Sequence, residues 1–214
     1  GERMPNGKLL VLDGLDGSGK STQFELLQTA LQKQGVSIQA VSFPDYDSPS
    51  AALVKMYLNG ELSNTPDGVN AYAASSFYAV DRYANYHLHW EQAYHNGTCI
   101  LASRYTTSNA IYQMGKLPKS EWDKYLQWLA EYEYGRLELP EPDTVIYLDY
   151  GSKEAGNNKY AKRAKESFWN CIDVLKSRPI NLNVHVIQGG EHNEASWEKR
   201  VPVFVEMFLR RVDK

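Results

Sequence analysis

The stretch Gly14-Leu15-Asp16-Gly17-Ser18-Gly19-Lys20-Ser21 decides the fold. It matches the pattern G-x-x-x-x-G-K-[ST] between an apolar run of strand length, residues 9–12, and a helical pattern that begins at Lys20. In that context the backbone N–H groups of the loop converge on an anion, and the following helix adds the positive end of its dipole. The pattern therefore predicts a loop that holds the phosphates of a nucleotide.

Eight residues of this stretch and the position after it are the expected nucleotide contacts: Gly14, Asp16, Gly17, Ser18, Gly19, Lys20, Ser21 and Thr22. Lys20 adds a full positive charge close to the β and γ phosphates. Ser21 is the candidate metal ligand, because the hydroxyl at this position of such loops contacts Mg²⁺.

Length and composition bound the remaining possibilities. A chain of 214 residues suffices for one α/β domain, and we expect residues 1–214 to form one. The net charge of −3 gives no overall field that favours nucleic acid or an anionic membrane. Cys99 and Cys171 are too few for a disulfide framework, and no apolar run is long enough to span a bilayer. We therefore expect a cytoplasmic protein with neither nucleic acid nor membrane as a partner.

Strand and helix patterns alternate along the chain. Strands are expected at residues 9–12, 36–43, 98–102, 144–148 and 184–187. Helices are expected at residues 20–34, 50–59, 67–96, 107–113, 119–135, 159–176 and 194–212. This alternation predicts an α/β fold with a five-stranded, doubly wound parallel sheet. The polar, glycine-containing stretch at about residues 150–160 is expected to be a short lid.

Ligands of such sheets bind beyond the carboxyl ends of the strands. This places four segments around one crevice: residues 14–21, 43–46 and 103–112, and the loop after Asp149. Tyr78 and Arg82 lie one helical turn apart, so one ligand can meet both side chains. Asn109 can donate to and accept from a pyrimidine edge. Core packing for Tyr78 and Tyr112, and a solvated helix charge for Arg82, are the simpler alternatives.

Four motifs occur in a familiar order. They are Leu12-Asp13-Gly14-Leu15-Asp16-Gly17-Ser18-Gly19-Lys20-Ser21-Thr22-Gln23, then Phe43-Pro44-x-Tyr46, then Tyr78-x-x-Asp81-Arg82, then Arg104-Tyr105-x-x-Ser108-Asn109-Ala110-x-Tyr112-Gln113. Together they resemble the thymidylate kinase family over about residues 8–149. The resemblance implies a P-loop nucleoside monophosphate kinase that transfers the γ-phosphoryl of ATP to dTMP with Mg²⁺, and that forms a homodimer.

The resemblance also assigns roles to residues of the acceptor site. Asp16 would hold the 3′-hydroxyl, and Arg104 would grip the acceptor phosphate. The thymine would stack on Tyr78, meet Arg82 at a carbonyl and bond Asn109 at N3. Tyr112 would exclude a ribose 2′-hydroxyl. The other expected substrate contacts are Phe43, Pro44, Tyr46, Ser108 and Gln113.

Two features depart from the family. Its third strand ordinarily runs into Asp-Arg-Tyr, whereas this chain has Ser103-Arg104-Tyr105. Members without an arginine in the phosphate loop generally bring one from the lid, but here the lid offers Lys153, and the first later arginine is Arg163. Either residue could substitute, or the segment is shortened or incomplete. The expected catalytic residues are Asp16, Lys20, Arg104, Lys153 and Arg163.

Three functions remain open on the sequence alone. The first is an active kinase for dTMP. The second is a related kinase with another deoxynucleotide or a deoxynucleoside as acceptor, against which the match at Asn109 and Tyr112 argues. The third is a nucleotide-binding protein that has lost turnover through Ser103 and the arginine-poor lid.

Overall fold

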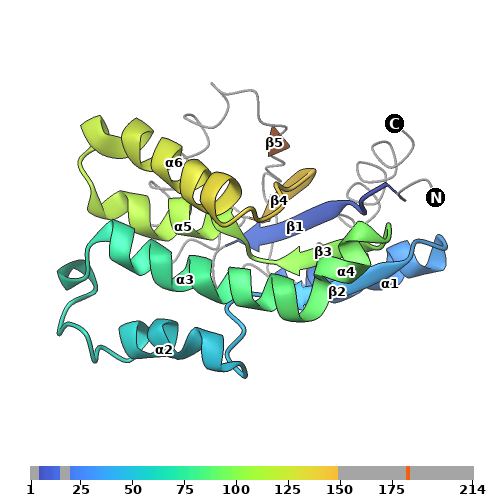
Figure 1. The fold of residues 1–214 in the computed structure, drawn as a ribbon, viewed down its shortest axis with the longest axis horizontal. Helices are drawn as coiled ribbons and strands as arrows, with labels where there is room; N and C mark the ends of the chain where they lie inside the picture. Colours follow the sequence, from blue (N-terminus) through green and yellow to red (C-terminus); the bar gives the residue numbers. More distant parts are fainter. Residues whose placement is uncertain (1–4, 15–19, 149–181, 184–214) are drawn as a thin grey trace, which may run out of the picture.

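The computed structural model describes residues 5–14, 20–148 and 182–183. Its strands form one parallel sheet in the order β2-β3-β1-β4-β5 (Figure 1). They are β1 (Leu9–Gly14), β2 (Ile38–Ser42), β3 (Cys99–Ser103), β4 (Thr144–Leu148) and β5 (Leu182–Asn183). The predicted five-stranded parallel sheet is confirmed. The fifth strand was expected at residues 184–187, which lie outside the described residues, and β5 ends just before them.

The central strand β1 is apolar because both faces of the sheet are covered. Leu9, Leu10, Val11 and Leu12 are each at most 1% exposed. Successive residues face opposite sides of the sheet, so Leu9 and Val11 pack in one core and Leu10 and Leu12 in the other. The first core is closed by Tyr86, Trp90 and Tyr105, and the second by Leu27 and Leu31 of helix α1 (Lys20–Lys33).

The long helical stretch expected at residues 67–96 begins later and is interrupted. Pro66–Gly68 forms a short 3-10 turn, and the Asn70 side chain accepts a hydrogen bond from the backbone N–H of Ala73 at 2.9 Å. This cap starts helix α3 (Ala71–Asn85). A π-helical turn, η3 (Tyr86–Trp90), then separates α3 from α4 (Glu91–His95).

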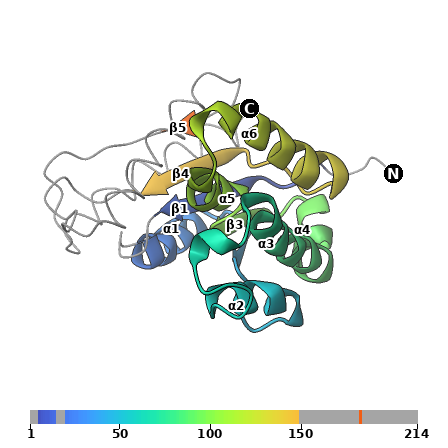
Figure 2. The same ribbon diagram turned by 90° about the vertical axis from the view of Figure 1, so that its left-hand side faces the viewer.

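The remaining helices pack beside α3 and carry the candidate site. Helix α5 (Thr106–Gln113) follows β3, and α6 (Trp122–Ala130) continues into a π-helical turn, η6 (Glu131–Arg136). Figures 1 and 2 show α2 (Ala52–Leu58) on the outer side of α3, away from α5. An apolar cluster joins α3, α5 and α6: Ala71, Ala110, Met114, Trp122, Tyr125, Leu126 and Leu129. No helix in the described part of the chain is both long and apolar enough to cross a bilayer.

Candidate active site

The carboxyl ends of three strands bring the expected donor and acceptor segments to one edge of the sheet. Ser103 pairs in register with Leu12 on one side and with Ser42 on the other. One residue further along, the backbone N–H of Arg104 donates to the carbonyl of Leu12 at 2.9 Å. The backbone N–H of Phe43 likewise donates to the carbonyl of Ser103 at 2.9 Å. The segment that begins the phosphate loop therefore adjoins the segment that carries Arg104.

The described part of the phosphate loop suits an anionic ligand. Gly14 ends β1, Lys20 begins α1, and the Lys20 ammonium donates a hydrogen bond to the Ser103 hydroxyl at 2.9 Å. Ser21 is exposed in the first helical turn, where an oxygen ligand of a phosphate-bound metal is needed. Asp16, Gly17, Ser18 and Gly19 lie outside the described residues, as do Lys153 and Arg163 of the expected catalytic set.

Arg104 adopts an unusual backbone conformation. Its φ is 65°, in the left-handed region that side-chain-bearing residues rarely occupy. Its guanidinium lies 5.4 Å from the ring centroid of Tyr112, which is 37% exposed. Strain of this kind gathers at ligand sites, where the surrounding structure maintains it. The two residues expected at the acceptor phosphate and sugar therefore lie together.

Tyr78 is half-buried, and its ring contacts that of Tyr57 on α2. The two rings meet edge to face with centroids 6.4 Å apart. The Lys116 ammonium donates a hydrogen bond to the Tyr57 hydroxyl at 2.8 Å and lies 4.8 Å from the centroid of the Tyr57 ring. These contacts hold Tyr57 in place. Burial raises the pKa of the Tyr78 phenol, Tyr57 and Tyr46 add to this, and Arg104 opposes it. Tyr78 is therefore neutral near pH 7.

Arg82 is not a solvated helix charge, because its side chain is only 1% exposed. Its Nε donates to Oε1 of Glu133, from η6, at 2.6 Å, and its guanidinium lies 5.9 Å from the ring centroid of Tyr105. Burial disfavours its charge, but the Glu133 carboxylate and this hydrogen bond raise the pKa of Arg82 above its usual value. The structure thus places Arg82 in a buried ion pair that sequence periodicity did not indicate.

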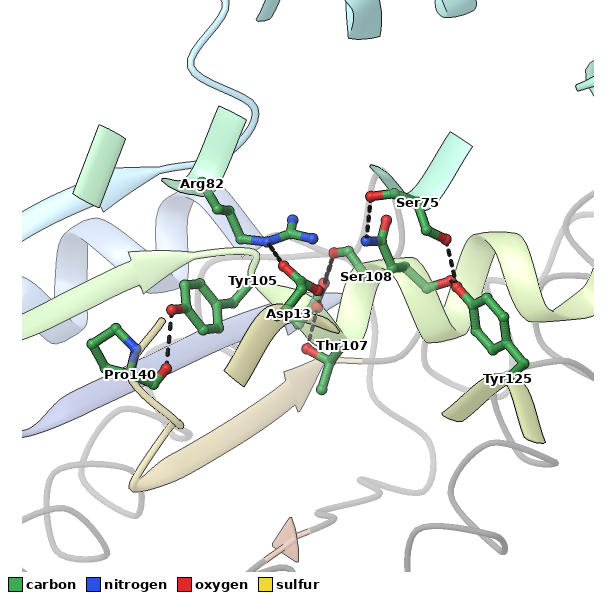
Figure 3. A network of polar contacts seen from close by, with 10 residues as sticks. Asp13, Ser75, Arg82, Tyr105, Thr107, Ser108, Tyr125 and Pro140 are labelled. Carbon is green, nitrogen blue, oxygen red and sulfur yellow. Dashed lines mark hydrogen bonds and ion pairs between the residues drawn. The ribbon is translucent and has the colours of Figure 1, made fainter. Parts of the chain in front are cut away.

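Polar contacts hold two of the other expected acceptor residues on α5, Ser108 and Asn109 (Figure 3). The Asn109 side-chain N–H donates to the carbonyl of Ser75 on α3 at 3.1 Å. The Ser108 hydroxyl donates to Asp13 at 2.9 Å, so its hydrogen is committed to the protein. Gln113 is 3% exposed, and its carbonyl oxygen Oε1 has no hydrogen-bond partner among the described residues.

The segment after β2 is held by the acidic residue of the Asp81-Arg82 motif. Asp81 accepts from the backbone N–H of Asp45 at 2.9 Å and from the Ser50 hydroxyl at 2.5 Å. Phe43 is buried, Pro44 is half-buried and Tyr46 is 48% exposed. Tyr46 therefore follows a fixed residue and presents part of its ring to solvent.

Sequence reasoning missed two buried carboxylates beside these residues. Asp13 was quoted as part of a motif but was given no role, and Glu133 was not singled out. The position of Asp13, immediately before the first glycine of the loop, was a usable signal. Glu133 offered none, because its partner Arg82 is 51 positions away in the sequence.

Comparison with known proteins identifies the family. The thymidylate kinase family matches residues 12–177 of the chain. The chain belongs to the thymidylate kinase family. A thymidylate kinase of Mycobacterium tuberculosis is 29% identical over 164 residues, which cover 74% of this chain and 73% of that protein. A thymidylate kinase of Schizosaccharomyces pombe is 29% identical over 172 residues, covering 80% and 75%.

A solved structure shows the same fold. The thymidylate kinase of Candida albicans superposes with a TM-score of 0.67 at 21% identity, covering 94% of this chain and 93% of that one. Enzymes of this family phosphorylate dTMP, and the chain is accordingly a phosphotransferase of this class. The expected family resemblance is confirmed, while the roles of individual site residues stay predictions.

Proposed function

We propose that this chain transfers the γ-phosphoryl group of ATP to dTMP at the carboxyl edge of its sheet, forming ADP and dTDP. One observation carries the proposal: the Lys20 ammonium bonds the side chain of Ser103, and Arg104 is the next residue. The cation of the nucleotide loop therefore lies against the residue that precedes Arg104, the cation of the expected acceptor segment. Phosphoryl transfer needs such cover, because its transition state spreads negative charge over the equatorial oxygens.

The reaction is a direct in-line displacement. A phosphate oxygen of dTMP forms the new bond to the γ-phosphorus while the bond from that phosphorus to the bridging oxygen of ADP breaks. Lys20 stabilises the charge of the moving group, and Arg104 holds the acceptor phosphate. Bound Mg²⁺ would neutralise charge on the ATP phosphates, and Ser21 is the described residue that would hold it. Asp16, Lys153 and Arg163 keep their expected catalytic roles as proposals.

Two polar atoms on α3 and α5 can form hydrogen bonds with the base of the acceptor nucleotide. Because the Asn109 N–H is bonded to Ser75, its oxygen is the atom left to accept the N3–H of thymine. Arg82 commits Nε to Glu133, and its Nη2 has no partner among the described residues, so Nη2 can donate to a base carbonyl. Tyr78 would stack on the base, with Tyr112 beside the sugar. Tyr46, Phe43, Pro44, Ser108 and Gln113 complete the proposed pocket.

An ADP-release assay with four acceptors tests this function. We expect turnover with dTMP and much weaker turnover with dCMP, whose base edge would leave the matched polar groups unpaired. Turnover with dUMP should fall by a smaller factor, because dUMP keeps that edge and lacks only the methyl group. Thymidine should give none, because it has no phosphate to accept the γ-phosphoryl group. A preference for another acceptor would support the related-kinase alternative. Calorimetric binding of ATP and dTMP without ADP release would instead support a nucleotide-binding protein.

We also propose that the active form is a homodimer. Val80, Tyr83 and Leu88, on α3 and η3, are 37%, 40% and 70% exposed, and they offer an apolar surface to a second copy. Sedimentation equilibrium tests this, with a monomer at micromolar concentration contradicting it. The cytoplasmic location expected from the sequence stays a prediction.

A further inference from the structure

We propose that Asp13 is a positioning residue that ties the first glycine of the phosphate loop to helix α5, and thereby sets the spacing between the two nucleotides. The inference rests on the proposed function, because α5 carries the proposed acceptor contacts Asn109 and Tyr112. Asp13 is not expected to touch either substrate. It acts through the backbone and side chains that do.

The Asp13 carboxylate is completely buried and has donors on both oxygens. Oδ1 accepts from the backbone N–H of Gly14 at 2.8 Å and from the Ser108 hydroxyl at 2.9 Å. Oδ2 accepts from the Thr107 hydroxyl at 2.7 Å and again from Ser108 at 2.9 Å. Figure 3 shows Thr107 and Ser108 converging on Asp13. One side chain therefore joins the start of the loop to the first turns of α5.

Packing alone does not account for this arrangement. A buried carboxylate is costly unless hydrogen bonds satisfy it, and an apolar side chain would fill the same space without that cost. Among the described residues, the donors come from the start of the loop and from α5, more than 90 positions apart in the sequence. On its far side α5 is fastened to α3 by the bond from Asn109 to Ser75. Asp13 supplies the polar link toward the loop.

The spacing matters because the reacting atoms must lie in line at near contact distance. A displacement of about 1 Å far from the chemistry can slow such a reaction by roughly a hundredfold. Loosening α5 from β1 lets the acceptor drift relative to the ATP phosphates while leaving each binding site intact. The expected result is a lower kcat with little change in either KM.

The decisive experiment measures spacing by binding. Adenosine and thymidine joined through four, five or six phosphates are titrated calorimetrically into the full chain. We expect the wild-type protein to prefer one linker length sharply. Thr107→Val removes one hydroxyl that donates to Asp13 while keeping the size of the side chain. In this variant we expect the three linker lengths to bind with more similar affinities and kcat to fall roughly tenfold. Asp13→Asn is expected to act in the same direction.

Thr106→Val is the matched control. Thr106 is the buried neighbour of Thr107, and its hydroxyl is not among the donors to Asp13. This variant should keep both kcat and the linker preference. If Thr107→Val and Asp13→Asn keep the preference within twofold of Thr106→Val, the positioning role is overturned while the proposed function stands. A wild-type protein that binds no linked ligand and turns over no dTMP overturns both.

Discussion

Nε of Arg82 lies 2.6 Å from Oε1 of Glu133, and neither side chain is more than 1% exposed. This ion pair joins α3 to η6 in the interior. Each partner also keeps one buried polar atom, Nη2 of Arg82 and Oε2 of Glu133, without a hydrogen bond among the described residues. The pair is therefore held by one strong contact, and removal of either side chain leaves an uncompensated charge.

Glu133→Ala should lower the free energy of unfolding by about 3–5 kcal/mol, because it leaves the Arg82 guanidinium buried without a counter-charge. Urea denaturation measures this. The double variant Arg82→Met, Glu133→Leu removes both charges and should recover most of the loss in stability. If the double variant is as unstable as Glu133→Ala, the unpaired charge is not the cause.

Arg104→Gly should separate stability from activity. Arg104 has a φ of 65°, which glycine adopts without strain and alanine does not. We expect the free energy of unfolding of Arg104→Gly to be about 0.5–1 kcal/mol higher than that of Arg104→Ala. This difference already includes the opposing effect of glycine, which makes the unfolded chain more flexible. Both variants should lose kcat/KM for dTMP by the equivalent of about 2–5 kcal/mol. Near-normal kinetics in either would remove Arg104 from the acceptor site.

The sheet was predictable because buried parallel strands are continuous apolar runs bounded by polar residues. For β4, Thr144–Leu148, the expected and observed bounds coincide. Helix starts were less predictable, since they depend on capping contacts. Asn70 caps α3 and so moves its start past the expected residue 67.

The adjacency of the two expected site segments was predictable, because it follows from local spacing and from the topology of the sheet. Arg104 comes directly after β3, and Lys20 follows β1 across the phosphate loop. The topology of a parallel sheet brings the segments beyond the carboxyl ends of these strands together. Contacts between residues distant in sequence were not predictable. Most glutamates are solvated, so nothing in the pattern distinguishes Glu133, and Asp13 meets Thr107 across 94 positions.

Alkaline pH should destabilise the fold in part through Tyr86. Burial raises the pKa of this phenol from 10.0 to about 12, so the folded protein retains a proton that the unfolded chain releases. Its contribution is therefore complete below about pH 10 and is lost as the pH rises to about 12, amounting to at most about 3 kcal/mol. Unfolding free energies across this range should fall less steeply in Tyr86→Phe.

The Ser103 hydroxyl accepts a hydrogen bond from the Lys20 ammonium at 2.9 Å, at the position where the sequence resemblance leads us to expect a carboxylate. Ser103→Ala removes that acceptor, and the loss of about 1 kcal/mol corresponds to a kcat/KM for ATP about fivefold lower. Ser42→Ala, the same change at the paired position of β2, is the control. Ser103→Asp should match or exceed wild-type activity, because a charge-assisted hydrogen bond holds the ammonium more firmly. Activity of Ser103→Asp below that of Ser103→Ala would show that a carboxylate there competes with the ATP phosphates for Lys20.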